Sequence, residues 1–88
     1  MILSVKTDQS HHPRTPFQGV LGNVIAYLRD GEGLSQRELA ELAGVDRGNL
    51  CEIEIGTANP KIATLEKIAA ALRKDITQLL KIALDKMG

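Results

Sequence analysis

Residues 34–46, LSQRELAELAGVD, decide the fold because they encode one complete helix and the turn that follows it. Ser35, followed three residues later by Glu38, forms a capping box, which predicts a helix over 36–43. The apolar side of this helix is expected to consist of Leu39, Ala40 and Leu42. Gly44 then ends the helix, since glycine readily adopts the left-handed conformation found at helix C-termini.

A second short helix is predicted directly after this turn, over 47–54, with Asp46 as its N-cap. Its large apolar residues are only Leu50 and Ile53, and its other side chains are polar or small. Because only three or four residues, including Gly44, separate the two helices, they must cross steeply and cannot form an antiparallel hairpin. The second helix therefore protrudes with a polar outer surface, which is the shape required to enter a DNA major groove, about 12 Å wide.

Three further helices are predicted around this unit, because apolar residues recur at helical spacing. They cover about 20–30, 61–72 and 76–84, and Asp75 with Gln78 forms a capping box at the start of the last helix. The residues expected to face inward are Leu21, Val24, Ile25, Leu28, Ile62, Leu65, Ile68, Ala69, Leu72, Ile76, Leu79 and Leu80. The pattern as a whole predicts an all-α fold of five helices.

The chain divides near residue 19, which places the five-helix domain in 20–88 and an extended or flexible arm in 1–19. The arm contains prolines and two adjacent histidines and shows no helical period. His11 and His12 could bind a metal, but adjacent histidines without carboxylate or cysteine support are more typical of a solvated tail. We therefore expect no metal and no cofactor.

The composition excludes several classes of protein. With 88 residues and a formal net charge of zero, the chain is one domain without a general attraction for nucleic acid or membranes. The single cysteine, Cys51, excludes an internal disulfide, and the chain has no apolar run long enough to cross a membrane. A reducing, cytoplasmic setting is expected. Cys51 is expected to be a small space-filling residue, because Glu52 and Glu54 flank it and give no positive charge that would activate a thiol.

The chain resembles the phage-repressor helix-turn-helix family, also called the Cro/cI-like or XRE family, over residues 20–84. Besides 34–46, the matching segments are Leu21-Gly22, Ile25-x-x-Leu28-Arg29, Ile53-Glu54-x-Gly56, Asn59-Pro60 and Thr64-Leu65-x-x-Ile68-Ala69-x-Ala71-Leu72. The resemblance implies a lambda-repressor-like domain that binds double-stranded DNA and regulates transcription. Such regulators usually act as homodimers on pseudo-palindromic sites.

The resemblance also implies roles for individual residues. The residues placed to contact DNA bases are Arg47, Gly48, Asn49 and Glu52. The residues placed to contact DNA phosphates are Ser35, Gln36, Asp46, Asn59 and Lys61. The Gln36 side chain is expected to point outward beside a helix N-terminus, which favours anions. Arg29 and Glu54 match a structural ion pair between the first helix and the end of the third.

Several departures from the family pattern bear on affinity for DNA. Gly48 offers no side chain for readout and costs about 1 kcal/mol in helix propensity relative to alanine. Lys61 replaces a common serine cap of the fourth helix, and Arg73 replaces the usual glycine or asparagine after it. Residues 35–56 contain two arginines and five acidic residues, which gives −3 on the unit that would face DNA.

Two functions from different classes fit these residues. The first is sequence-specific binding of double-stranded DNA by a homodimeric transcriptional regulator, for which the family resemblance implies a repressor. The second is a protein-interaction module, such as an antitoxin or adaptor with weak or no DNA binding, which the local charge of −3 favours. Glu52 could accept a hydrogen bond from cytosine or could be a surface acid paired with Arg47. An enzyme is not expected, because the sequence has no nucleophile–base set, phosphate loop or metal motif.

A dimer could form through either end of the chain. Residues 1–5 could pair with a second chain as an intermolecular strand. The last helix has more apolar residues than one buried face can hold, and surplus apolar surface often marks a partner site. We therefore expect the dimer surface to include Leu80, Leu84 and Met87.

Overall fold

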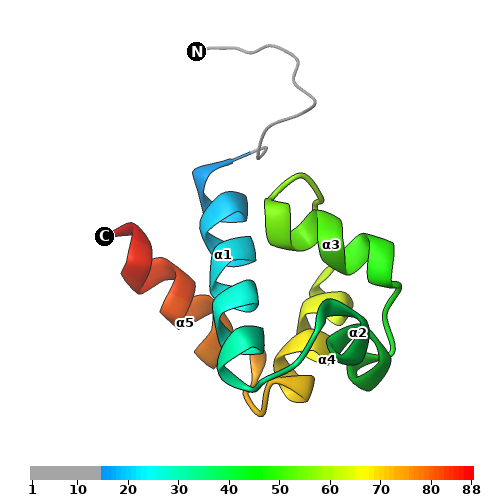
Figure 1. Ribbon diagram of the computed structural model, residues 1–88. Coiled ribbons are helices and arrows are strands. Elements are labelled where there is room, and N and C mark those ends of the chain that lie inside the picture. The colour runs from blue at the N-terminus through cyan, green and yellow to red at the C-terminus, as the bar shows by residue number, and fades with distance from the viewer. Residues whose placement is uncertain (1–14) are drawn as a thin grey trace.

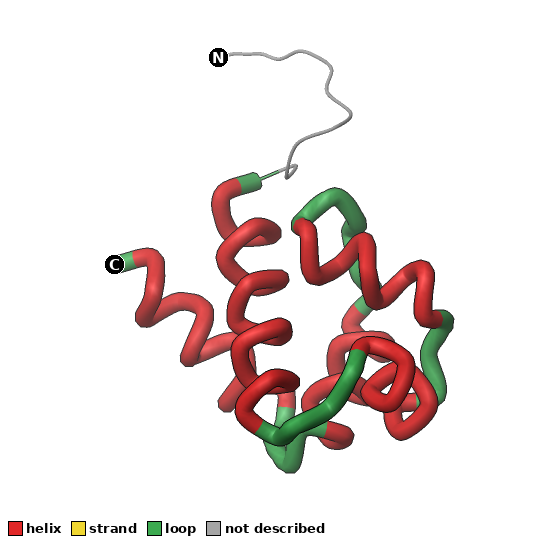
Figure 2. The backbone as a smooth tube through the Cα atoms, in the orientation of Figure 1, coloured by secondary structure: helices red, strands yellow, loops and turns green. Residues whose placement is uncertain are grey.

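The structure, a computed structural model, describes residues 15–88, which fold into five helices. The helices are α1 (Pro16–Gly31), α2 (Gln36–Ala43), α3 (Arg47–Ile55), α4 (Ile62–Ala71) and α5 (Ile76–Met87). Figures 1 and 2 show these helices joined by short loops, without a strand in the described part of the chain. The prediction of an all-α, five-helix domain is confirmed. The predicted intermolecular strand and the histidine pair lie outside the described residues.

Helix α1 begins four residues before its predicted start, and this corrects the boundary between arm and domain. Thr15 is the N-cap, and its Oγ1 accepts a hydrogen bond from the backbone N–H of Gln18 at 3.1 Å. Pro16 suits the first helical position, because the N–H that proline lacks would have no partner within the helix there. Residues 16–19 therefore belong to α1. The other helix boundaries lie within three residues of the prediction, with α5 continuing to Met87.

The five helices form a closed ring of contacts around one core. Helix α1 packs against α3 and α5, α2 packs against α3 and α4, and α4 also packs against α5. The largest fully buried side chains, which come from every part of this ring, are Ile25, Leu39, Leu50, Ile68, Leu72 and Leu79. One shared core therefore fixes the position of α3, and α3 has no separate stability of its own.

Two residues predicted to face inward are exposed. Leu42 is 64% exposed, because the buried stripe of α2 is centred on Leu39, Ala40 and Ala43 and Leu42 lies beside it. Ile62 is 62% exposed, because it is the first residue of α4 and extends beyond the neighbouring helices. In α2 the prediction chose Leu42 in place of the neighbouring Ala43, and in α4 it began the buried face one turn too early.

The predicted helix caps are confirmed. Ser35 Oγ accepts from the N–H of Glu38 at 3.0 Å, and the Glu38 carboxylate accepts from the N–H of Ser35 at 2.8 Å. This second bond holds the pKa of Glu38 below its ordinary value. Asp75 and Gln78 form the same reciprocal arrangement at α5. At α4, by contrast, Lys61 is the N-cap and makes no side-chain capping bond, as its replacement of serine predicts.

Gly22 allows α1 and α3 to approach more closely than any other residue would permit. A Cβ atom added to Gly22 would lie 2.3 Å from the backbone oxygen of Ile53 and 2.5 Å from that of Glu54. Both distances are far shorter than van der Waals contact. The last turn of α3 therefore rests directly on the backbone of α1, and this contact sets the depth at which α3 is seated.

Arg73, in the turn between α4 and α5, has a φ of +64° and is the one non-glycine residue with positive φ in 15–88. The left-handed conformation costs an L-residue about 1–2 kcal/mol. A glycine at this position avoids that cost, but the greater conformational entropy of glycine in the unfolded chain offsets about 0.5–1 kcal/mol of the gain. We expect Arg73→Gly to raise the free energy of unfolding by about 0.5–1 kcal/mol in urea denaturation. Lys74→Gly, where φ is not positive, should lower it, and a loss of stability in both variants would contradict the prediction.

Candidate nucleic-acid interface

The turn between α2 and α3 has the geometry that the sequence predicted. Gly44 ends α2 in the left-handed conformation, with φ 71° and ψ 35°. The N–H of Val45 then donates to the oxygen of Ala40 at 3.0 Å, which closes the end of the helix. Val45 is half-buried and packs against the core. These contacts direct the chain across α2 and hold α3 at a steep angle to it, as Figure 1 shows.

Helix α3 presents one buried and one open side. Leu50, Ile53 and Glu54 are buried beneath it. Of the four residues predicted to contact bases, Arg47, Gly48 and Glu52 are exposed, whereas Asn49 is half-buried at the flank. Ile55 is the last residue of α3, one residue beyond the predicted end of the helix, and is 60% exposed. Its place seven residues after Gly48 puts it on the same open face.

The N-termini of α2 and α3 are the other places where this unit could contact phosphates. Ser35 and Asp46 each cap one of them, and Asp46 Oδ2 accepts from the N–H of Asn49 at 2.9 Å. The Ser35 hydroxyl can still donate its proton to a phosphate. A carboxylate has no proton to donate, so a phosphate contact at Asp46 would have to use backbone N–H groups. Phosphate is attracted to such N-termini by the helix dipole.

The predicted ion pair between Arg29 and Glu54 is present and is buried. Arg29 donates from Nε to Glu54 Oε2 at 2.8 Å and from Nη2 to Oε1 at 3.0 Å, which is a two-pronged contact. The hydrogen bond to Glu54 raises the pKa of Arg29. Nη1 of the same guanidinium donates to the backbone oxygen of Leu34 at 2.8 Å. The pair therefore ties α1 to the end of α3 and to the loop before α2.

The Gln36 side chain turns inward, so the prediction that it points outward is wrong. Its Nε2 donates to Glu54 Oε1 at 2.8 Å, so the amide turns toward the buried ion pair. The residue is half-buried. Nε2 carries two hydrogens, so one of them can still donate to a phosphate. The one feature that could have indicated this contact is the expected pairing of Glu54 with Arg29, because a carboxylate has more acceptor sites than one arginine fills.

The loop between α3 and α4 carries the two remaining residues predicted to contact phosphates. Asn59 and Lys61 are both exposed. A contact that was not predicted fixes this loop to α1: Gln18 Nε2 donates to the backbone oxygen of Ala58 at 3.3 Å. The structure thus places Ser35 and Asp46 at the N-termini of α2 and α3, Gln36 against Glu54 near the end of α3, and Asn59 and Lys61 on the loop that follows α3.

Three further properties of the described residues bear on function: surface charge, metal-binding clusters and membrane-spanning helices. Of the five acidic residues in 35–56, Glu54 is buried and paired with Arg29, so the exposed side chains of this stretch, two arginines and four acids, carry −2. In 15–88, no group of three or more His, Cys, Asp or Glu is arranged to hold a metal ion. The helices over the same residues are too short or too polar to cross a membrane.

Comparisons with known proteins agree with this geometry. The helix-turn-helix family HTH_3 matches residues 25–79. The immunity repressor protein of Bacillus phage phi105 is 35% identical over 60 residues, which are 68% of this chain and 42% of that protein. The chain thus spans less than half the length of this relative.

Solved structures show the same fold. The restriction-modification controller protein C.AhdI from Aeromonas hydrophila superposes with a TM-score of 0.68 at 34% identity, over 70% of this chain and 94% of that one. The clp gene regulator ClgR from Corynebacterium glutamicum superposes with a TM-score of 0.77 at 29% identity, over 85% of this chain and 80% of that one. The family match covers the last two turns of α1, all of α2, α3 and α4 and the first turn of α5, and the chain belongs to the HTH_3 family, the Cro/cI-like XRE helix-turn-helix proteins that bind DNA and regulate transcription.

Proposed function

We propose that this protein is a homodimeric repressor that recognises a specific sequence of double-stranded DNA. The observation that carries the proposal is the open face of α3, where Arg47 and Glu52 stand exposed above a thin buried seam. The names of the phage immunity repressor and of the controller and regulator proteins support a role in repression. No other surface of residues 15–88 combines helix N-termini, a protruding helix and exposed hydrogen-bonding groups in this way.

In this proposal α2 lies across the DNA backbone and α3 enters the major groove. Arg47, near the N-terminus of α3, reads a guanine through O6 and N7, and Glu52 accepts from a cytosine amine or orients Arg47. Gly48 leaves room for the DNA to come close to the helix backbone. Phosphates bind at the N-termini of α2 and α3 and at Lys61, which sets the register without reading sequence.

The net negative charge of residues 35–56 limits the expected affinity for DNA. Few phosphates are neutralised by basic side chains, so the affinity should depend less on salt than that of a broadly basic domain. A monomer would therefore bind weakly, and two copies that contact successive half-sites would be needed for useful affinity. Leu84 and Met87 are exposed and Leu80 is half-buried, which keeps the predicted α5 surface open for a second copy.

Arg47→Ala tests the proposed base contact. We expect it to weaken binding to a selected operator by about 1–3 kcal/mol, or roughly 5- to 150-fold, and to relax the preference at one base pair. Lys81→Ala removes the same charge from the outer face of α5 and serves as the matched control. Gel shifts and sequence selection with each variant provide the measurement. An unchanged affinity and preference for Arg47→Ala would remove Arg47 from the contact set.

A second candidate function is a protein-interaction module, such as an antitoxin or adaptor whose partner is a toxin or another protein. The observation that favours it is the net charge of −2 on the exposed side chains of residues 35–56, since an acidic surface suits a basic protein partner better than DNA. Gel shifts on genomic fragments at low salt separate the two functions. Absence of any binding there would leave the interaction module as the better account.

A further inference from the structure

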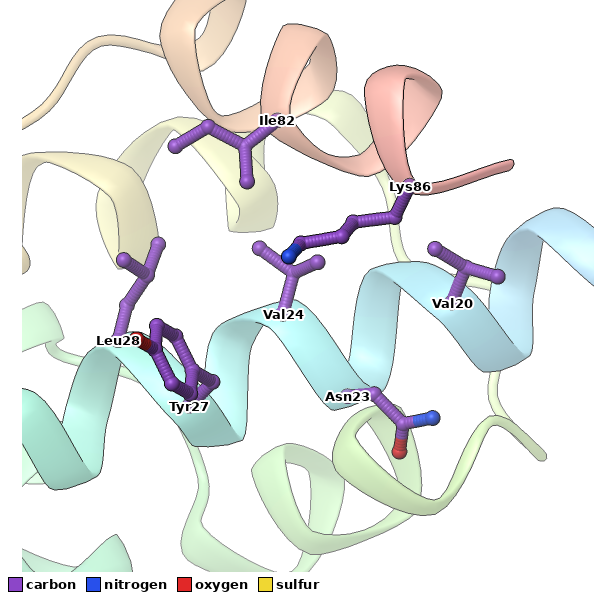
Figure 3. A pocket seen from close by; sticks show the side chains of 7 residues that line it. All are labelled: Val20, Asn23, Val24, Tyr27, Leu28, Ile82 and Lys86. Carbon is purple, nitrogen blue, oxygen red and sulfur yellow. The ribbon is translucent and has the colours of Figure 1, made fainter. Parts of the chain in front are cut away.

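Six large apolar side chains are exposed in residues 15–88, and one of them belongs to α3. It is Ile55, which is 60% exposed at the last position of that helix. The other five, on the remaining four helices, are Tyr27, Leu42, Ile62, Leu84 and Met87. Among these, Tyr27 lines an apolar groove of about 580 Å³ between α1 and α5, which Figure 3 shows and which lies outside the α2–α3 unit. Ile55 is therefore the large apolar side chain that α3 itself exposes.

Ile55 belongs to a column of residues along the middle of the open face of α3. Gly48, Cys51 and Ile55 follow one another at spacings of three and four residues, so they share one side of the helix. At 100° per residue, Arg47 and Glu52 lie about 70° to either side of this column. The open face thus has charged flanks and an uncharged centre.

The centre of this face offers no strong hydrogen-bonding side chain to a base. Gly48 has no side chain, and the thiol of Cys51 is only a weak donor and acceptor. Cys51 is also half-buried, so Ile55 is the large side chain that this column exposes. A surface of this kind distinguishes base pairs by apolar contact, because it has no group with which to bond their polar edges.

We propose that Ile55 is a specificity-determining residue that recognises the C5-methyl group of a thymine in the major groove. The inference rests on the proposed function, in which α3 enters that groove. Thymine presents its methyl group there, and apolar side chains recognise the methyl group by direct contact. The contact is favourable because it removes apolar surface of both partners from water.

The length of α3 sets where this thymine lies relative to the base pair read by Arg47. Ile55 is eight residues beyond Arg47, which is about 12 Å along the helix axis. Base pairs follow one another every 3.4 Å, so the two contacts are separated by roughly three to four base pairs when α3 lies along the groove. Gly48, between them, has no side chain to hold α3 away from the base edges.

Deoxyuridine in place of thymine tests the contact, because it removes the C5-methyl group and keeps the base pair. In an operator obtained by sequence selection, each thymine is replaced in turn, in both half-sites together. At one of these positions the parent should lose about 15-fold in affinity, or about 4-fold for each methyl group that leaves a buried contact. With Ile55→Ala, the same replacement should change the affinity less than about 2-fold, because the methyl group no longer has its partner. Fluorescence anisotropy titrations provide the measurement.

Two further variants separate recognition from a general loss of binding. Ile62→Ala removes the same side chain from a position that is 62% exposed outside α3, so it should keep the full deoxyuridine effect. Ile55→Val keeps a branched apolar side chain and should retain most of that effect. A merely destabilised protein would bind every sequence less well and would leave the deoxyuridine effect unchanged. Because Ile55 and Ile62 are exposed, all three variants should keep the helical circular dichroism of the parent.

The inference and the proposed function fail in different ways. A selected operator without an invariant thymine overturns the inference, as does a parent that is insensitive to deoxyuridine at every position. An Ile55→Ala protein that keeps the full deoxyuridine effect overturns it too, and these three results leave DNA binding intact. A parent that binds no genomic fragment at low salt contradicts the DNA-binding function and the inference together.

Discussion

Gly22→Ala should lower the free energy of unfolding by about 2 kcal/mol. The new methyl group would lie 2.3 Å from the backbone oxygen of Ile53, and neither helix backbone can move without disturbing the core. Overpacking a well-filled interior costs about 1–3 kcal/mol and sometimes more. Alanine regains up to about 1 kcal/mol in helix propensity, which offsets only part of this cost. Urea denaturation followed by circular dichroism provides the measurement.

Gly31→Ala is the matched control for this prediction. Gly31 is the last residue of the same helix, and an added Cβ would meet no atom within 4 Å. The control should therefore leave stability unchanged or raise it by up to about 1 kcal/mol. If both variants had the stability of the parent, the close approach of α1 and α3 would not be a constraint on the fold.

Glu54→Ala should have an effect of similar or greater size. Removing one partner of a buried ion pair costs about 3–5 kcal/mol, because the remaining charge stays buried without compensation. Here the Arg29 guanidinium would lose both hydrogen bonds to Glu54 and keep only the longer contact with exposed Asp30 at 3.7 Å, and the Gln36 amide would lose its acceptor. We expect a correspondingly lower midpoint in urea denaturation.

The paired variant Arg29→Met with Glu54→Leu separates a buried charge from a loss of packing. Replacing both partners with apolar side chains of similar volume leaves no unpaired charge, so the double variant should be more stable than Glu54→Ala. A double variant at least as unstable as Glu54→Ala would show that the ion pair itself, and not the isolated charge, carries the stability.

Local signals predicted most of the fold. The capping boxes at Ser35 and Asp75, the glycine at 44 and the cap at Asp46 act within a few residues, so a short stretch of sequence is enough to recognise each one. The ion pair between Arg29 and Glu54 was found only through the family resemblance, because its two residues lie 25 positions apart. The same resemblance pointed to the open face of α3.

The remaining features depend on how distant segments meet. The close approach at Gly22 depends on backbone oxygens of α3, and no pattern within α1 reports them. The inward turn of Gln36 required an acceptor 18 residues away. The start of α1 was missed for a different reason, since Pro16 ends most helices but is well suited to begin one. The groove between α1 and α5 exists only once both helices are in place.

The bonds to Glu54 determine which helices can unfold locally while the rest of the protein stays folded. Its carboxylate joins α1 to the first residue of α2, and its backbone lies against Gly22, so α2 and α3 cannot detach from α1 separately. In native-state hydrogen exchange, the slowest amides of α1, α2 and α3 should therefore share one opening free energy, equal to that of global unfolding. The last turn of α5, which ends at exposed Met87, should exchange much faster by fraying. The proposed DNA-binding surface of α2 and α3 would thus be lost only together with the whole domain.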